Sequence, residues 1–571
     1  MTTGRRLSCY VALAAALACS IVVFASPKDK DKEKENNSEV KFTARTELVL
    51  IPTLVTDKSG NHISGLKKED FTVLENGAEQ KIATFEEITS DPHRLSRTNN
   101  PNEFSNSLAG ETPNRRITLM VLDLINTRFV DQAYARKDLL KYLTQSVDQR
   151  EPTALYTLTR SGIHVVHDFT TDPRVLVAAL HKVKGDTSQM VDSQEDVEAI
   201  TGTASPDGSA GVDPGAVQSE AQQLQTMMED SELNFQSFEQ RLAITYTLQG
   251  MQQIAQSLAG FPGRKSLIWA SGGFPFSVSD NTMQLAPAGR DTLSDVLPMY
   301  EHTWQLLNDA QIALYPVDVK GLQTVGMASA SVRNPGKNYG RNMNWKNLDT
   351  QATLETFASM TGGRAYFNSN DLVKGFRAAV NDSAEYYMLG YYLERSKTKA
   401  GWRKVAVKVK RDHVEVRARS GFFVTNATVD PENSHNADIS SALQSPLDYT
   451  SLTLMARWNK IEPGKEPGKK HVNYEMHLAP DPVLIDDADN NHVVLEFLVL
   501  AKTPEGKIVD RPVGQKVEKN LTADKVSAVR EKGIAYSGAL ELSPGEYTVR
   551  FVVRDDLSGR VGSVAAPLKV E

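Results

Sequence analysis

The sequence predicts a multidomain protein whose central α/β domain, doubly wound around a mostly parallel, Rossmann-like sheet, is flanked by an N-terminal and a C-terminal β module. Three observations lead to this prediction. The chain has 571 residues, too many for one hydrophobic core. From residue 115 apolar strand-like runs alternate with helical patterns, as in parallel sheets with helical crossovers. Short strand-like runs separated by turns dominate before residue 90 and after residue 451.

Residues 1–25 have the features of a signal peptide. Arg5 and Arg6 precede an apolar run, and Ala25 stands where a signal peptidase would cut before Ser26. The alternative is a retained signal anchor, although the run is shorter than the ~20 residues of a comfortable membrane span. We therefore expect an exported protein that is periplasmic, extracellular or associated with a cell envelope, and that contacts a membrane only through such an anchor.

Composition excludes several classes of function. The two cysteines, Cys9 and Cys19, lie inside the predicted signal peptide, so the remaining chain has no thiol for disulfides or catalysis. Without residues 1–25 the formal charge changes from -7 to -9, because 62 basic side chains then face 71 acidic ones. Such a mildly acidic chain lacks the concentrated basic surface that general nucleic-acid binding needs.

The N-terminal region after the signal peptide is predicted to contain a linker and a β module. Residues 26–39 are a charged, disordered linker because they lack apolar side chains. Residues 40–90 form a small β-sandwich-like module, with strands at 46–55 and 70–75 and a turn signal at Asn76-Gly77. A polar loop at 90–114 follows.

Residues 115–384 form the predicted α/β domain, with an insertion at 185–233 where turn residues and polar side chains replace apolar periodicity. Residues 385–425 are expected to be a β extension that packs with the N-terminal module. The expected strands of the domain are 117–123, 154–159, 163–169, 266–270, 311–317 and 363–367, and its expected helices are 131–147, 173–184, 235–258, 349–360 and 371–379.

The C-terminal part is predicted to contain a linker at 430–450 and an immunoglobulin-like β-sandwich at 451–571. The run 546–554 alternates apolar and polar residues and follows Pro544-Gly545, as in an antiparallel sheet. We expect this module to be a binding domain or a spacer domain, and its fold alone does not identify a ligand.

Polar residues follow the apolar strands of the α/β domain directly. Asp123, Ser271 and Asp318 each end one strand, and Asn126 and Thr127 come just after the first of them. The carboxyl ends of parallel strands lie along one edge, where ligands bind in open α/β sheets. We therefore expect a partner-binding edge made of Asp123, Asn126, Thr127, Asp131, Ser271, Gly272 and Asp318.

Several stretches together resemble a von Willebrand factor type A domain, and more narrowly a VWFA-related family named from acidobacterial proteins. The resemblance covers about residues 40–424. It is carried by Leu122-Asp123-Leu-Ile-Asn126-Thr127, Asp131-Gln132-Ala-Tyr, Leu314-Tyr-Pro-Val-Asp318, Thr361-Gly-Gly-Arg-Ala365 and Val416-Arg-Ala-Arg-Ser-Gly-Phe422.

The resemblance implies a metal-ion-dependent adhesion site, which this chain matches only in part. Asp123 and Thr127 fit the first and last positions of D-x-S-x-S, but Ile125 in the middle has no oxygen. Ser271 stands where the family has T-D-G, so a second carboxylate is missing. A Mg²⁺ ion, or Mn²⁺ or Ca²⁺, would need oxygens from Asn126, Asp131, Ser271 or Asp318 in addition. Alternatively, Asp123 and Thr127 cap the following helix.

The function predicted from these features is that of an exported, non-enzymatic binding protein of adhesion type. Its A-type domain would recognise a protein partner at the edge described above, with or without a metal. One alternative is a structural protein of the bacterial cell envelope with an inert edge. Another is a serine hydrolase-like enzyme using Ser271 with Asp123 or Asp318, although Ser271 lacks a G-x-S-x-G motif.

Overall fold

A computed structural model describes most of the chain after residue 45. The predicted signal peptide, the charged linker and residues 186–216 of the expected insertion lie outside the described residues. In the described part, no helix is both long enough and apolar enough to cross a membrane. The described ranges are 46–89, 102–107, 117–145, 151–185, 217–279, 282–284, 293–321, 339–369, 371–382, 384–394, 398–424, 431–486 and 489–571.

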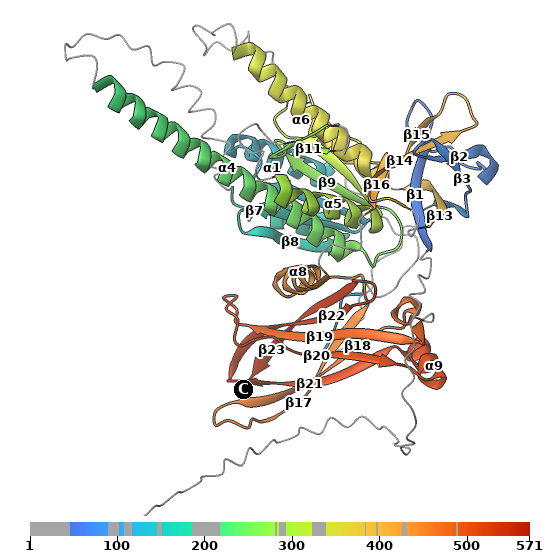
Figure 1. The fold of residues 1–571 in the computed structure, drawn as a ribbon, viewed down its shortest axis with the longest axis vertical. Coiled ribbons are helices and arrows are strands. Elements are labelled where there is room, and N and C mark those ends of the chain that lie inside the picture. The colour runs from blue at the N-terminus through green and yellow to red at the C-terminus, as the bar shows by residue number, and fades with distance from the viewer. Residues whose placement is uncertain are drawn as a thin grey trace, which may run out of the picture. The chain divides into compact units, whose positions relative to one another are not determined.

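The N-terminal strands form two antiparallel sheets together with strands from residues 385–424 (Figure 1). Long apolar strands from the two segments pair in register, with Thr46 opposite Glu394. A shared core that includes Ile51, Val73 and Tyr387 lies between the sheets. One sheet has the order β15 (Glu415–Arg417), β1 (Thr46–Thr56), β13 (Glu385–Glu394), β4 (Thr84–Thr89). The other has the order β16 (Gly421–Val424), β14 (Gly401–Val409), β2 (Phe71–Glu75), β3 (Ala78–Gln80). A short helix, η1 (Lys68–Asp70), precedes β2.

The α/β region is built on a five-stranded, mostly parallel sheet. Its central strands are buried on both faces, which explains their unbroken apolar runs. The last strand in the sheet order runs antiparallel, because a tight turn at Gly162 reverses the chain directly after its neighbour. The order is β12 (Ile312–Asp318), β9 (Lys265–Ser271), β6 (Ile117–Asp123), β7 (Thr153–Thr159), β8 (Gly162–Thr170).

Helices cover both faces of this sheet. On one face Leu119 and Trp269 pack against α4 (Val217–Leu258), α5 (Leu293–Asp309) and α6 (Tyr339–Thr361). On the other face Met120 and Ile268 pack against α1 (Phe129–Gln145), α2 (Pro173–Leu180) and α7 (Leu372–Asn381). A small hairpin, β10 (Ser277–Ser279) and β11 (Thr282–Gln284), follows β9. The protein is thus a mixed α/β multidomain chain.

Two expectations for this region were wrong. The helix expected at 235–258 starts earlier, because α4 begins at Val217 and runs through polar sequence that shows little apolar periodicity. The expected strand at 363–367 is reduced to a single bridge between Tyr366 and Val317. At Gly363 an added Cβ would lie 1.9 Å from Leu314 O, so the chain there lies close against β12.

The C-terminal region contains two four-stranded antiparallel sheets around one apolar core (Figure 1). The expected linker at 430–450 contains a helix, α8 (Pro431–Gln444). The first sheet has the order β21 (Ile534–Leu542), β18 (Lys470–Leu478), β17 (Leu454–Pro463), β5 (Glu103–Ser105). The second has the order β20 (Val513–Asn520), β19 (His492–Lys502), β22 (Gly545–Asp555), β23 (Val561–Val570). The helices η4 (Pro482–Leu484) and α9 (Ala523–Lys532) lie between strands along the chain.

Strand β5 comes from the stretch expected to be a polar loop at 90–114. It pairs with β17 and therefore extends a sheet of the C-terminal region. Asn106, directly after it, donates from Nδ2 to Tyr449 O at 2.6 Å and to Leu452 O at 2.8 Å, and accepts from Leu454 N at 2.9 Å. These buried bonds fix the segment to the sheet, which composition alone did not reveal.

Candidate functional site

The carboxyl ends of the parallel strands bring the predicted edge residues to one side of the sheet. Asp318 lies opposite Ser271 in the register of β12 and β9, and Ser271 Oγ lies 2.9 Å from Asp123 Oδ2. Every predicted residue of the edge is buried, including Asn126, Thr127, Asp131 and Gly272. The edge is therefore a packed polar interior and not an open surface.

The Asp123 carboxylate is surrounded by hydrogen-bond donors. Its Oδ1 accepts from Asn126 N at 3.0 Å, and its Oδ2 accepts from Asn126 Nδ2 at 2.8 Å and Trp269 Nε1 at 3.0 Å. Ser271 Oγ is within hydrogen-bond distance of the same Oδ2. Burial raises the pKa of Asp123, and the hydrogen bonds from Asn126, Trp269 and Ser271 act in the opposite direction.

Thr127 and Gly272 close the loops on either side of this carboxylate. Gly272 N donates to Thr127 Oγ1 at 2.8 Å. A Cβ on Gly272 would lie 3.0 Å from Asn126 O, so the absence of a side chain allows the two loops to approach. Asn126 Nδ2 also donates to Thr247 Oγ1 at 2.9 Å, which links the loop to α4.

Asp131 and Asp318 have hydrogen bonds of their own. Arg128 Nε donates to Asp131 Oδ2 at 2.8 Å, and Lys320 N donates to Asp318 Oδ1 at 2.9 Å. Burial raises the pKa of Asp318, although Lys320 opposes the rise. Among the described residues, the carboxylates of Asp123, Asp131 and Asp318 do not form a group whose ligand atoms all lie within 4.8 Å of one another.

These contacts do not fit a divalent cation at Asp123. A cation needs several free oxygen ligands, whereas Asp123 Oδ2 already accepts from Asn126 Nδ2 and Trp269 Nε1. Asn126 Oδ1 has no hydrogen-bond partner among the described residues, and one such oxygen does not make a cation site. Thr127 Oγ1 accepts a hydrogen bond from Gly272 N. The helix-capping alternative is also wrong, because Asp123 bonds Asn126 in the loop, before α1 begins at Phe129.

Ser271 does not fit the role of a nucleophile in this arrangement. It is fully buried, and its hydroxyl lies between Asp123 Oδ2 and Gly273 O. A serine nucleophile is activated by an adjacent general base and must be reached by substrate. The contacts of Ser271 instead join the ends of β6 and β9.

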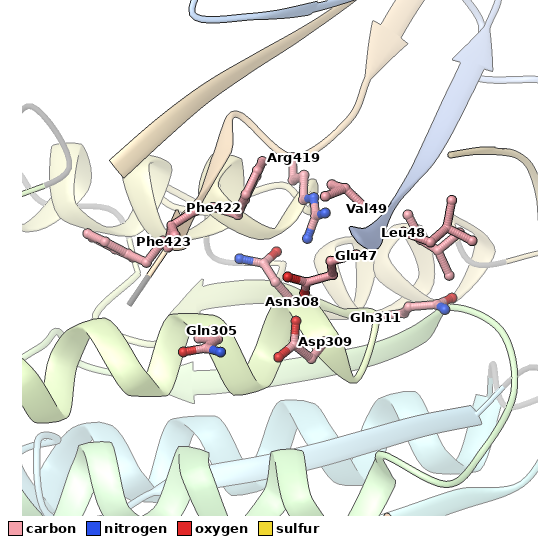
Figure 2. A pocket seen from close by; sticks show the side chains of 12 residues that line it. Glu47, Leu48, Val49, Gln305, Asn308, Asp309, Gln311, Arg419, Phe422 and Phe423 are labelled. Carbon is pink, nitrogen blue, oxygen red and sulfur yellow. The ribbon is translucent and has the colours of Figure 1, made fainter. Parts of the chain in front are cut away.

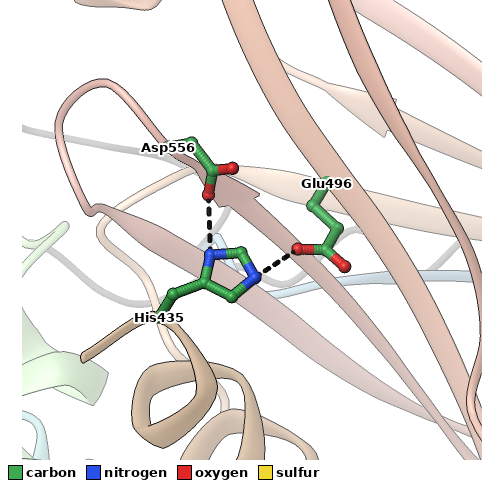
Figure 3. Close-up of side chains that lie close together, drawn as sticks. All are labelled: His435, Glu496 and Asp556. Atoms are coloured by element: carbon green, nitrogen blue, oxygen red, sulfur yellow. Dashed lines mark hydrogen bonds and ion pairs between the residues drawn. The ribbon is translucent and has the colours of Figure 1, made fainter. Parts of the chain in front are cut away.

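A second polar cluster lies in the C-terminal region and was not predicted. His435 on α8 lies between two carboxylates, with Nε2 2.8 Å from Glu496 Oε2 and Nδ1 3.1 Å from Asp556 Oδ1 (Figure 3). Lys516 Nζ lies 2.8 Å from Asp556 Oδ2, and Arg554 also pairs with Asp556. Burial raises the pKa of Asp556, but hydrogen bonds from Lys516 and Arg554 leave it below the ordinary value.

This cluster, which we call the His435 cluster, fits an ion-pair network better than a metal site. One ligand atom of each residue lies within 4.8 Å of the other two, but each carboxylate is already paired with its own ring nitrogen of His435 (Figure 3). The cationic groups of Lys516 and Arg554 already neutralise Asp556. The three residues are distant in sequence and form no motif, so no sequence signal pointed to them.

The surface next to the predicted edge carries exposed apolar side chains at the start of α1. Phe129, Val130 and Tyr134 are 50%, 58% and 64% exposed. They begin two residues after Thr127, and the same helix buries Ala135, Leu139 and Leu143 against the sheet. We call Phe129, Val130 and Tyr134 the α1 patch. Large apolar groups exposed together are typical of interaction surfaces.

Comparisons of the sequence with protein-family models and with curated proteins found no match. The resemblance to von Willebrand factor type A domains therefore rests on the quoted residues alone.

Proposed function

We propose that this chain is an exported, non-enzymatic binding protein whose α/β domain, of doubly wound A type, recognises a protein partner on the side where the parallel strands end. The observation that carries the proposal is the α1 patch, which places two aromatic side chains and a valine in solvent beside that edge. Aromatic residues are enriched at protein interfaces because they bury a large area at small entropic cost.

The contacts at the edge support recognition without a cation. Asp123 is already satisfied by protein donors, so a partner carboxylate has no metal to complete there. The buried network would instead hold the loop before α1, and with it the α1 patch, in one position. Rigid presentation lowers the entropic cost of binding.

The alternatives are less well supported by the same residues. A hydrolase would need an accessible Ser271 with a base beside it, and Ser271 is buried between Asp123 and Gly273. A purely structural envelope protein would have no need of exposed aromatic groups. If an assembly of such a protein covered the α1 patch, the patch would still act as a binding surface.

A capture experiment tests the proposal. The purified protein, the double variant Phe129→Ser/Tyr134→Ser and the control Tyr392→Ser are each immobilised and exposed to envelope extract with EDTA or with Mg²⁺. Tyr392 is a matched control because it is an aromatic residue of β13, outside the α1 patch, with 61% exposure. We expect one partner to be retained by the wild type and by Tyr392→Ser, lost from the double variant, and unaffected by EDTA. Equal capture by the double variant, or capture only with Mg²⁺, would contradict the proposal.

A further inference from the structure

The cavity between the strand β1, the end of α5 and the strand β16 is lined by charges of both signs (Figure 2). Its volume is about 130 Å³, and Arg419, Glu47 and Asp309 are among its lining residues. Arg419 is buried, its Cζ lies 5.2 Å from the centre of the Phe422 ring, and its Nε has no hydrogen-bond partner among the described residues. Because the lining carries a cation and two carboxylates, this cavity favours no single class of ligand.

The exposed stripe of α1 carries charge of one sign. Val130, Tyr134, Lys137 and Lys141 are exposed and follow one another at spacings of four, three and four residues. Such spacings place side chains in one stripe along a helix. The apolar stripe that begins at Val130 therefore continues directly into two lysines.

The end of α2 adds two more lysines beside the α1 patch. The helices α1 and α2 pack on each other through a shared apolar core. A Cβ on Gly185 would lie 2.7 Å from Phe129 Cε2, so the chain that leaves α2 passes directly against this ring. Lys182 and Lys184 come just before Gly185 and are exposed. We call Lys137, Lys141, Lys182 and Lys184 the lysine group.

The carboxylates of α1 do not neutralise the lysine group. Asp131 is buried and accepts from Arg128 Nε at 2.8 Å. Asp138 accepts from a backbone N–H at the start of α7, where Asp371 is exposed. Asp138 comes nine residues after Phe129, so the two lie on opposite sides of a helix with about 3.6 residues per turn. Within the described part of the chain, no member of the lysine group forms an ion pair.

The combination of apolar and cationic side chains selects among possible occupants. A second copy of the chain docking through the same surface would bring lysines against lysines, because a two-fold contact pairs a patch with itself. A helix that lies in a membrane surface keeps its lysines on the face opposite its apolar side chains, whereas Lys137 and Lys141 continue the apolar stripe of α1. A protein segment with carboxylates beside apolar side chains complements both parts of this surface.

We propose that the partner of the α1 patch presents an acidic segment, whose apolar side chains pack on the patch while its carboxylates pair with the lysine group. This inference rests on the proposed function, because it names the chemistry of the partner at the same site. Exposed ion pairs of this kind steer association and are screened by salt. They give selectivity to the apolar contact without a cation.

Fluorescence anisotropy on the purified full chain tests the proposal with a defined probe. The probe is a short labelled peptide in which glutamates surround a leucine and a phenylalanine, and a second peptide has glutamine in place of every glutamate. We expect saturable binding of the acidic peptide that weakens as NaCl is raised from about 50 to about 300 mM. The glutamine peptide should bind at least about tenfold more weakly.

Variants with matched changes of charge locate the binding. Replacing all four members of the lysine group with glutamine should weaken the acidic peptide by about tenfold or more, and Phe129→Ser/Tyr134→Ser should weaken it as well. The control replaces four exposed lysines outside the α/β domain with glutamine and should bind as the wild type does. These control positions are Lys404, Lys408, Lys507 and Lys525.

Several results would overturn the inference. They are no saturable binding of the acidic peptide, equal binding of the glutamine peptide, equal weakening by the lysine-group variant and its control, and binding that either the lysine-group variant or the double variant leaves unchanged. Binding to phosphatidylglycerol vesicles that requires the lysine group and the α1 patch, without binding of the acidic peptide, would assign the surface to a membrane instead.

Capture from envelope extract judges the proposed function separately. A partner that the lysine-group variant still retains and Phe129→Ser/Tyr134→Ser loses would leave the proposed function standing and overturn the acidic segment alone. A partner that both variants retain would contradict the proposed function itself.

Discussion

Replacing Lys265 with methionine is expected to stabilise the α/β domain, and the gain should depend on pH. Lys265 is 2% exposed at the start of β9, and its Nζ donates to Phe261 O at 2.7 Å. Burial lowers the pKa of Lys265 from 10.5 to about 7. Methionine has a similar length and an apolar end, so it can occupy the same space without the cost of burying a charge.

The size and sign of the effect follow from linkage. The pKa of Lys265 falls by about 3.5, from 10.5 to about 7. At about 1.36 kcal/mol for one pKa unit, burying the charged form costs ~5 kcal/mol. Between pH 7 and 10.5 the Lys265 side chain is protonated in the unfolded chain and neutral in the folded chain. The loss of folding stability caused by the buried charge is therefore complete below pH 7 and disappears as the pH rises to 10.5. Losing the bond to Phe261 O removes ~1 kcal/mol of the gain.

The assay is urea unfolding at pH 6 and pH 9.5, followed by the fluorescence of the buried Trp269 and Trp304 in the same domain. Lys265→Met should be more stable than the wild type by roughly 2–4 kcal/mol at pH 6 and by clearly less at pH 9.5. The exposed Lys374→Met serves as the control. A gain that does not change with pH, or a loss of stability at both values, would refute the reasoning.

The remaining predictions concern other parts of the chain. Asn106→Ala should destabilise the C-terminal region by roughly 2–3 kcal/mol, because three buried hydrogen bonds are lost, and limited proteolysis should then cut near residue 106; an unchanged digestion pattern would speak against this role. Gly272→Ala should lower the melting temperature, since its Cβ would lie 3.0 Å from Asn126 O; a variant as stable as the wild type would show that the loops can move apart. N-terminal sequencing of the exported protein should begin at Ser26, and recovery of Met1 would favour the retained anchor.

The arrangement of the strand ends was predictable because it follows from topology. Unbroken apolar runs with polar ends indicated parallel buried strands, and such strands place Asp123, Ser271 and Asp318 along one edge. The hydrogen-bond partners of these residues were not predicted, although the sequence contained a signal for one of them. Side chains two positions apart share a face of a strand, so Trp269 lies on the same face as Ser271 and its N–H could have been expected near Asp123.

Other features depended on contacts that sequence patterns do not encode. Strand β5 is only three residues long and pairs with a strand about 350 positions later, so no local signal distinguished it from a loop. The His435 cluster joins a helix, a strand and a turn, and the unsatisfied Arg419 is visible only once burial is known. The first part of α4 was missed because its polar sequence lacks the apolar spacing by which helices are recognised.

The central claim is that buried protein donors satisfy the Asp123 carboxylate, and that this network supports the α1 patch without a cation. The most direct measurement is the melting temperature of the wild type and of Asp123→Ala, each in EDTA and in Mg²⁺. The variant leaves Trp269 Nε1 and Asn126 N without the acceptor that Asp123 provides, at ~1–3 kcal/mol each. We predict a large loss of stability of the same size in both solutions, and no effect of Mg²⁺ on the wild type. A wild type that Mg²⁺ stabilises, with that stabilisation absent in Asp123→Ala, would contradict the claim.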